Sequence, residues 1–221
     1  MSEFHTEPIH VLISTGNPDK AHELRALLGD RFVVQTKNEA GFSDLIIDET
    51  GSTLEENARI KVVGLYRALL EEGKDPNALW ILADDTGLFV DALDGRPGVY
   101  SARYAGPGAT YADNVHKLQK EMEATPWQNR GARFRTVIAL CRNGETETVE
   151  GILEGRILEH ERGTNGFGYD PLFYVAEEGR TLAEMSDVEK NHISHRSRAY
   201  RALLKKLEEE GVLAKGDDNE E

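Results

Sequence analysis

The amino-acid sequence predicts an α/β fold built on a mixed β-sheet. Short apolar runs that suit buried strands alternate with segments that have the apolar spacing of amphipathic helices. One strong hairpin signal, Asn143-Gly144, adds an antiparallel strand pair. No internal repeat and no linker rich in Pro, Gly or Ser divides the 221 residues, so we expect a single folded domain over residues 9–210.

The first expected unit is a strand followed by a helix. Residues 9–14 form a short apolar run. Asn17 suits the N-cap of the helix, and Pro18 suits the first helical position because its missing N–H has no partner there. The helix ends at Gly29, and its apolar face consists of Ala21, Leu24, Leu27 and Leu28.

A second helix and a second strand follow. Thr53 and Glu56 have the spacing of a capping box, and the helix behind them is expected to reach Gly73. Its buried stripe would be Leu54, Ala58, Val62, Leu65 and Leu69. Residues 78–83 have the apolar character of a buried strand.

The second half of the chain adds the hairpin, a loop and a last helix. We expect a strand over residues 134–142 and its partner over 146–152. A glycine-rich loop covers 163–168, and a second capping box is formed by Ser186 and Glu189. The last helix has Ala199, Leu203 and Leu207 on one face.

The charge of the chain argues against a general nucleic-acid binder. The formal net charge is −14 at pH 7, and an acidic surface repels the phosphates of DNA and RNA. A polyanionic ligand would therefore have to bind in a local pocket of basic side chains, backbone N–H groups and a metal ion. Part of the excess charge lies in the acidic segment 211–221, which we expect to be a disordered tail.

The ends of the chain and its single cysteine indicate a cytoplasmic protein. No apolar stretch approaches the ~18 residues that span a bilayer, so no membrane association is expected. Residues 1–8 are polar, lack the apolar region of a secretory signal, and are expected to be flexible. Cys141 has no partner for an internal disulfide.

The turn from the first strand into the first helix could bind a phosphate. Thr15, Gly16 and Asn17 lie where free N–H groups and the positive end of a helix point to one place. Lys20 could add a point charge. The alternative is an ordinary strand–helix turn with an exposed lysine.

Two consecutive carboxylates, Asp84 and Asp85, end the second expected strand. Carboxylates in an apolar setting need a compensating positive charge, and a hard cation such as Mg²⁺ would supply it. The alternative is a turn in which an aspartate accepts from backbone N–H groups. Asp48 or Glu49 could provide a further metal oxygen, and Lys61 could face the same cleft from the second helix.

The glycine-rich loop could surround a base. Phe167 and Tyr169 could stack on it, while Asp170 could accept from a base N–H. A rigid loop with core aromatics is the competing interpretation. Further along, Lys190 and Arg196 could meet a phosphate or a carbonyl, or lie at a solvated helix junction.

Taken together and in order, these segments resemble the inosine triphosphate pyrophosphatase family. The resemblance runs from about Val11 to Leu207. It is carried by six motifs that begin at Thr15, Glu56, Ala83, Gly95, Phe167 and Ile193, namely T-G-N-x-x-K, E-N-A-x-x-K, A-D-D-T-G, G-R-P-G-V-Y-S-A-R-Y, F-G-Y-D-P and I-S-H-R.

The resemblance implies a long mixed sheet flanked by helices, two lobes around a central nucleotide-binding cleft, and a homodimer. It assigns Asp85 as the catalytic residue and a Mg²⁺ ligand, with Asp48 as the second metal carboxylate. The residues implied to bind substrate are Thr15, Gly16, Asn17, Lys20 and Lys61 at the triphosphate, Thr86 beside it, and Phe167, Gly168, Tyr169, Asp170, Lys190, His195 and Arg196 at the base and sugar.

Three positions depart from the family's pattern. Thr86 replaces a serine and keeps the hydroxyl, whereas Ser197 replaces a glycine and restricts the backbone. Asp48 replaces a more frequent glutamate, and its shorter reach makes Glu49 the substitute metal ligand.

The implied activity is Mg²⁺-dependent hydrolysis of non-standard purine nucleoside triphosphates, such as ITP, dITP and XTP, to the monophosphate and pyrophosphate. This reaction would remove these nucleotides from the cellular pool. Two alternatives are a sensor that binds a nucleotide without turnover and a Mg²⁺-dependent nucleotidyltransferase. The Asp84–Asp85 pair favours an enzyme over a sensor, and product analysis separates the hydrolase from the transferase.

Overall fold

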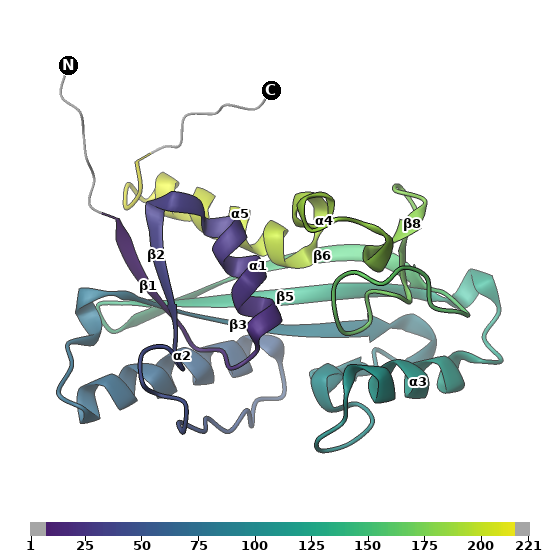
Figure 1. Ribbon diagram of the computed structural model, residues 1–221, viewed down its shortest axis with the longest axis horizontal. Coiled ribbons are helices and arrows are strands. Elements are labelled where there is room, and N and C mark those ends of the chain that lie inside the picture. The colour runs from purple at the N-terminus through teal and green to yellow at the C-terminus, as the bar shows by residue number, and fades with distance from the viewer. Residues whose placement is uncertain (1–7, 215–221) are drawn as a thin grey trace.

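The computed structural model describes residues 8–214, which fold around one long β-sheet (Figure 1). The strands are β1 (Ile9–Ile13), β2 (Phe32–Thr36), β3 (Trp80–Val90), β4 (Pro97–Gly98), β5 (Gly131–Arg142), β6 (Glu145–Ile157), β7 (Phe173–Val175) and β8 (Arg180–Thr181). Their order is β2-β1-β3-β5-β6-β7-β8, with β4 paired to β3. The β1–β2 and β1–β3 pairs are parallel and the other pairs are antiparallel, as expected for a mixed sheet.

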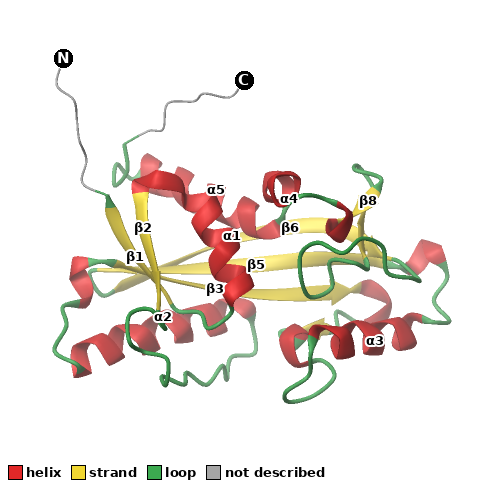
Figure 2. Cartoon of the chain, viewed as in Figure 1, coloured by secondary structure: helices red, strands yellow, loops and turns green. Residues whose placement is uncertain are grey.

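Helices cover both faces of the sheet (Figure 2). Figure 1 shows α2 (Leu54–Glu71) and α3 (Tyr111–Met122) on one face, and α1 (Pro18–Leu28), α4 (Asp187–Ile193) and α5 (His195–Glu209) on the other. Within residues 8–214, none of these helices is long and apolar enough to cross a membrane.

Alternation along β3 supplies two separate cores. Ile81 and Ala83 are buried with the apolar stripe of α2, whereas Leu82 is buried with α1 and α5. Successive side chains of a strand point to opposite faces, so each face of the sheet has its own cluster. The next two residues of the strand, Asp84 and Asp85, continue this alternation.

A third core defines a second lobe. Leu88 and Val90 of β3, Phe134 of β5, and Leu153 of β6 pack with Leu118 of α3 and with apolar residues of the segment 169–185. The long strands β3, β5 and β6 therefore run through both lobes and hold them together. This two-lobed α/β arrangement confirms the predicted fold class.

The predicted helix starts are confirmed. Asn17 caps α1, and Thr53 and Ser186 form capping boxes with Glu56 and Glu189. The β5–β6 hairpin turns at Asn143 and Gly144, with φ angles of 51° and 78°, as the Asn-Gly signal predicts.

β3 is longer than the sequence pattern predicts. The predicted strand ends at residue 83, whereas β3 continues to Val90, in unbroken register with β5 from Ile81 onward. The two aspartates do not end the strand because basic side chains on each face compensate their charges. β2 and α3 are also absent from the predicted elements, although Thr110 and Asp113 form a capping box at the start of α3.

The ends of the domain are only partly described. Residues 1–7 and 215–221 of the expected flexible segments lie outside the described residues. Leu213 is 4% exposed and packs in the core beside α5. The packed region therefore includes part of the segment 211–221 that the sequence places in the tail.

Candidate functional site

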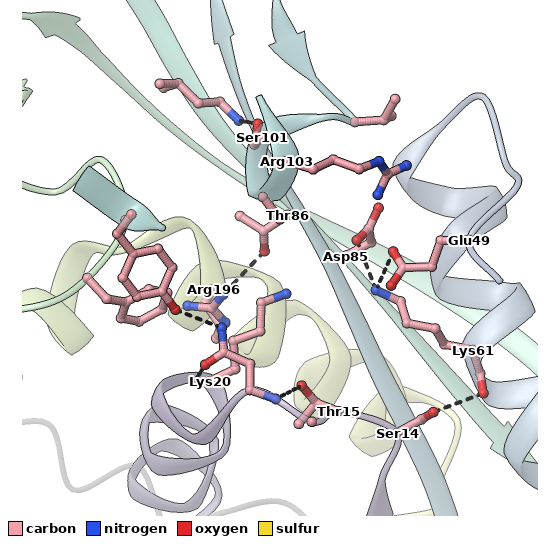
Figure 3. A pocket seen from close by; sticks show the side chains of 18 of the residues that line it. Ser14, Thr15, Lys20, Glu49, Lys61, Asp85, Thr86, Ser101, Arg103 and Arg196 are labelled. Carbon is pink, nitrogen blue, oxygen red and sulfur yellow. Dashed lines mark hydrogen bonds and ion pairs between the residues drawn. The ribbon is translucent and has the colours of Figure 1, made fainter. Parts of the chain in front are cut away.

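A cavity of about 520 Å³ lies where three parts of the chain meet: the turn between β1 and α1, the helix α2, and segments of the second lobe. It brings together all but one of the site residues that the sequence predicts, including Thr15, Gly16, Asn17, Lys20, Lys61, Asp85, Thr86, Phe167, Gly168, Tyr169, Asp170, Lys190, His195 and Arg196. Asp48 is the exception. Figure 3 shows the charged and hydroxyl side chains of this cavity at close range.

The β1–α1 turn is organised around Asn17. Its Oδ1 accepts from the backbone N–H groups of Asp19 (2.9 Å) and Lys20 (3.4 Å), and its own N–H donates to Thr15 Oγ1 (3.1 Å). The side chain of Lys20 reaches Asp84 at 3.0 Å. Burial lowers the pKa of Lys20, although Asp84 opposes the shift. The turn places a helix N-terminus and an ammonium group together at the cavity.

Asp84 and Asp85 have different partners on opposite faces of the sheet. Asp84 is buried beneath the cavity, where Lys20 and Arg196 (3.2 Å) approach its Oδ2. Burial alone would raise the pKa of Asp84, but Lys20, Arg196 and Lys61 hold it below its ordinary value. Among the residues that the structure describes, Asp84 Oδ1 has no hydrogen-bond partner. Asp84 therefore serves as the buried counter-ion of two cavity cations.

Asp85 faces α2 and lines the cavity. Its Oδ1 accepts from Lys61 Nζ at 2.9 Å, and its Oδ2 accepts from Asn57 Nδ2 at 3.3 Å (Figure 3 shows the lysine contact). Burial raises the pKa of Asp85 above its ordinary value, against the pull of Lys61 and Lys20. A carboxylate with a raised pKa at the edge of a cavity is suited to accept a proton.

The second carboxylate at this edge is Glu49, whereas Asp48, the residue that the resemblance implies, does not line the cavity. Glu49 is half-buried and lies 3.2 Å from Lys61 Nζ, whereas Asp48 is exposed outside the cavity. Exposure alternates from Ile46 to Thr50, as in extended backbone, so neighbouring side chains point in opposite directions. The departure at Asp48 is thus accompanied by a glutamate one residue later.

The carboxylates of Asp85 and Glu49 fit a magnesium site that substrate phosphates complete. Both are hard oxygen donors and both converge on one ammonium group, that of Lys61. Within residues 8–214, no three His, Cys, Asp or Glu side chains form a group that could hold a metal ion by themselves. Mg²⁺ is commonly held by one or two carboxylates together with phosphate oxygens, which matches this donor set.

The opposite end of the cavity contains the F-G-Y-D loop. Asp170 Oδ2 accepts from Lys190 Nζ at 2.6 Å and from the Phe167 N–H at 2.9 Å. The Phe167 ring is half-buried, whereas Tyr169 is buried in the second-lobe core and its hydroxyl donates to the Ser101 carbonyl at 2.8 Å. Phe167 is therefore the better placed of the two rings to stack on a ligand.

Glu23 of α1 is a functional candidate that the sequence analysis missed. It accepts from Lys190 Nζ at 2.7 Å and forms a short ion pair with Arg196. Burial alone would raise the pKa of Glu23, but Arg196 and Lys190 hold it below its ordinary value. The signal was its position three residues after Lys20, which places both side chains on one side of α1.

His195 and Arg196 open α5 and lie against the sheet. His195 Nδ1 is 2.6 Å from Thr136 Oγ1, and burial lowers the pKa of its imidazole well below 6.5, so the ring is neutral at pH 7. Gly151 of β6 allows this close packing, because a Cβ there would meet the His195 carbonyl oxygen at 2.2 Å. The backbone of the sheet thus fixes where these two side chains enter the cavity.

The fold and the cavity together indicate which class of protein this is. A two-lobed α/β protein whose cavity joins a helix N-terminus, several cations, a carboxylate with a raised pKa and a half-buried aromatic ring has the features of a nucleotide-binding protein. The chain belongs to the Ham1 family, whose model matches residues 11–206. This match confirms the resemblance that the motifs predict.

Relatives and solved structures agree with the family assignment. A dITP/XTP pyrophosphatase of Thermoanaerobacter sp. (strain X514) is 47% identical over 204 residues, which cover 90% of this chain and 98% of that protein. The dITP/XTP pyrophosphatase of Bacillus subtilis (strain 168) is 44% identical over 199 residues, covering 89% and 96%. The Staphylococcus aureus Ham1 protein superposes with a TM-score of 0.78 at 38% identity, covering 91% of this chain and 99% of that one.

Proposed function

We propose that this protein hydrolyses non-standard purine nucleoside triphosphates, dITP and XTP among them and ITP as well, to the monophosphate and pyrophosphate. The relatives named dITP/XTP pyrophosphatase align over nearly their whole length and support this activity. The observation that carries the proposal within the chain is the position of Asp85. It lies across the cavity from the β1–α1 turn, in contact with Lys61 and beside Glu49.

In the proposed reaction the triphosphate is held at the β1–α1 turn. Backbone N–H groups near Gly16 and Asn17 and the ammonium group of Lys20 would bind phosphate oxygens. Asp85 would orient a water molecule and accept its proton as the oxygen attacks the α-phosphorus. Lys61, which already contacts the carboxylate, would keep Asp85 in this orientation and stabilise charge on the phosphates. Positioning and electrostatics therefore account for most of the catalysis.

Asp85 and Glu49 would hold the Mg²⁺ ion. When bound, Mg²⁺ neutralises phosphate charge and polarises the phosphoryl group. Lys61 would then have to share the two carboxylates with the ion, which its single flexible ammonium group permits.

Base selection is assigned to the loop at 167–170 and the start of α5. Phe167 would stack on the purine, and Asp170 would accept from N1–H, a group that hypoxanthine and xanthine have and adenine lacks. Arg196 is less free than the sequence implies, because Asp84, Glu23 and Thr86 already occupy its guanidinium. A hydrogen bond from Arg196 to O6 would use the donor capacity that remains.

A panel of nucleoside triphosphates tests the activity. Purified protein is incubated with Mg²⁺ and dITP, ITP, XTP, dATP or dGTP, and pyrophosphate and monophosphate are quantified. We expect equimolar monophosphate and pyrophosphate from the first three substrates. Release of orthophosphate, transfer of the nucleotide to an acceptor, or binding without turnover would each contradict the proposal.

Three parts of the proposal rest on the resemblance and the composition. We propose a cytoplasmic enzyme that works as a homodimer and does not bind nucleic acid, consistent with a net charge of −14. Light scattering after gel filtration tests the dimer, and a mass equal to one 24.6 kDa chain would contradict it.

A further inference from the structure

Six lysine and arginine residues line the cavity, and five of them have fixed partners. Lys20, Lys61, Lys190 and Arg196 form ion pairs with buried or half-buried carboxylates, and Lys37 donates to the Leu45 carbonyl at 2.6 Å. The sixth is Arg103. Within the described residues, its guanidinium forms no hydrogen bond and no ion pair, and its side chain is exposed to the cavity.

The backbone that presents Arg103 is held firmly. Ser101 is buried, and its hydroxyl accepts from the Leu88 N–H (2.8 Å) and donates to the Gly98 carbonyl (2.6 Å). The buried amide of Asn114 donates to the Ala102 carbonyl (3.1 Å) and accepts from the Ala105 N–H (2.8 Å). Tyr169 adds its bond to the Ser101 carbonyl. A solvated surface arginine needs no such support.

The direction of the side chain is visible in Figure 3. Arg103 extends from the second lobe toward Asp85 and Glu49, the end of the cavity where the phosphates and the metal ion are placed. The Tyr100 ring lies 5.3 Å from the guanidinium carbon and supports the side chain from its lobe. Free donors on a planar fork are suited to bidentate contact with a phosphate.

We propose that Arg103 is a further catalytic residue that binds the departing pyrophosphate. This rests on the proposed function. In the reaction, a water oxygen forms a bond to the α-phosphorus while its proton passes to Asp85. The bond from the α-phosphorus to the bridging oxygen breaks, and the electron pair remains on that oxygen, which leaves with the β- and γ-phosphates. The guanidinium of Arg103 stabilises the negative charge that develops there.

The test compares Arg103→Ala and Arg103→Lys with Arg67→Ala, which removes an exposed arginine of α2 that does not line the cavity. We expect Arg103→Ala to lower kcat for dITP by ~10²-fold, the scale for loss of one preorganised donor. Arg103→Lys should recover part of the rate, because it retains the charge but not the fork. Arg67→Ala should match the wild type.

Calorimetric titration in metal-free buffer separates the two products. We expect inorganic pyrophosphate to bind Arg103→Ala ~10-fold more weakly than wild type, the loss expected for one charge-assisted bond, and dIMP to bind both equally. Equal weakening of both ligands would place Arg103 at the α-phosphate or sugar and overturn the proposal, as would unchanged pyrophosphate affinity. A wild type that releases no pyrophosphate from dITP would refute the proposed function, whereas these titrations would still show whether Arg103 binds pyrophosphate.

Discussion

The hydroxyl of Tyr111 joins the two lobes by accepting a hydrogen bond from Asn17 Nδ2 at 3.0 Å. Tyr111 is the first residue of α3, and Asn17 caps α1. The same hydroxyl donates to Asp19 at 3.0 Å, and the Tyr111 ring lies 5.8 Å from that of Phe167. One side chain therefore contacts both the turn assigned to phosphate and the ring assigned to the base.

Tyr111→Phe is expected to raise KM for dITP by ~3–10-fold, the effect of about 1 kcal/mol for a hydrogen bond that positions the turn. Neither kcat nor Tm should change much, because the residue is 43% exposed. Steady-state kinetics measure this. Tyr66→Phe is the control, since it removes a hydroxyl that bonds Asn77 away from the cavity. An unchanged KM would mean that the bridge has no part in binding.

Asp85→Asn is expected to lower kcat by at least ~10²-fold while the protein remains folded, because the amide cannot accept the water proton. Pyrophosphate release from dITP is the assay, and circular dichroism checks the fold. Asp91→Asn is the control: Asp91 is an exposed aspartate that pairs with Arg133, and its substitution should leave kcat unchanged. Near-normal turnover in a folded Asp85→Asn protein would remove this residue from the mechanism.

Glu49→Gln and Asp48→Asn distinguish the two candidate metal carboxylates. We expect Glu49→Gln to raise the Mg²⁺ concentration for half-maximal rate by ~10-fold or more. Loss of a residue that only supports a metal ligand weakens metal affinity by at least ~10-fold, and loss of a direct ligand should weaken it at least as much. Asp48→Asn should behave as wild type because its side chain is exposed outside the cavity. The reverse pattern would restore the assignment made from the sequence.

Leu213→Ala is expected to destabilise the protein by about 2–5 kcal/mol, the usual effect of truncating a buried leucine. Leu213 is 4% exposed, whereas its neighbour Val212 is 40% exposed and provides the control in Val212→Ala. Urea unfolding followed by fluorescence measures both. Equal midpoints for the two variants would show that the segment after α5 does not contribute to the core.

The capping box of α4 predicts a pH-dependent contribution to stability. Hydrogen bonds from the Ser186 backbone, with Arg180 and the Ser186 hydroxyl, lower the pKa of Glu189 from 4.5 to about 2. A lowered carboxylate pKa adds stability that is present above pH 4.5 and is lost as the pH falls toward 2. The difference in Tm between wild type and Glu189→Gln should therefore shrink over this range.

Glu177→Gln is the matched control for this experiment, since it changes an exposed glutamate of the preceding turn. Its Tm should follow that of the wild type at every pH. A Glu189→Gln difference that stays constant between pH 5 and pH 2 would contradict the lowered pKa, because this range runs from above the ordinary pKa of 4.5 down to the lowered pKa of about 2.

Local signals predicted much of the fold. The N-caps at Asn17, Thr53 and Ser186 and the turn at Asn143 depend on neighbouring residues, so the sequence contains their full explanation. The end of β3 was misplaced because the charges of Asp84 and Asp85 are compensated by Lys20, Arg196 and Lys61, which are distant in sequence. The local hydrophobic pattern cannot predict partners that are distant in the sequence.

In the candidate site, too, local features could be predicted from the sequence and long-range pairings could not. The motifs predicted which segments meet, but not how Glu23, Lys190 and Arg196 would pair once they met. The choice between Asp48 and Glu49 depended on which side chain an extended segment turns inward, and a one-residue difference in phase is not visible in composition. Arg103 belongs to a recognised motif, yet its freedom follows only from the partners that the other cations have.

The alternation of Asp84 and Asp85 has a consequence for insertions and deletions. One added residue in β3 before Asp84 would turn the proposed catalytic carboxylate toward α1 and the counter-ion toward α2, reversing both assignments at once. The loop at 105–110, which leads into α3 within the second lobe, could gain several residues without moving either acid. Variation in length among related enzymes should therefore accumulate in such loops, while the count of residues from Ile81 to Asp85 stays constant.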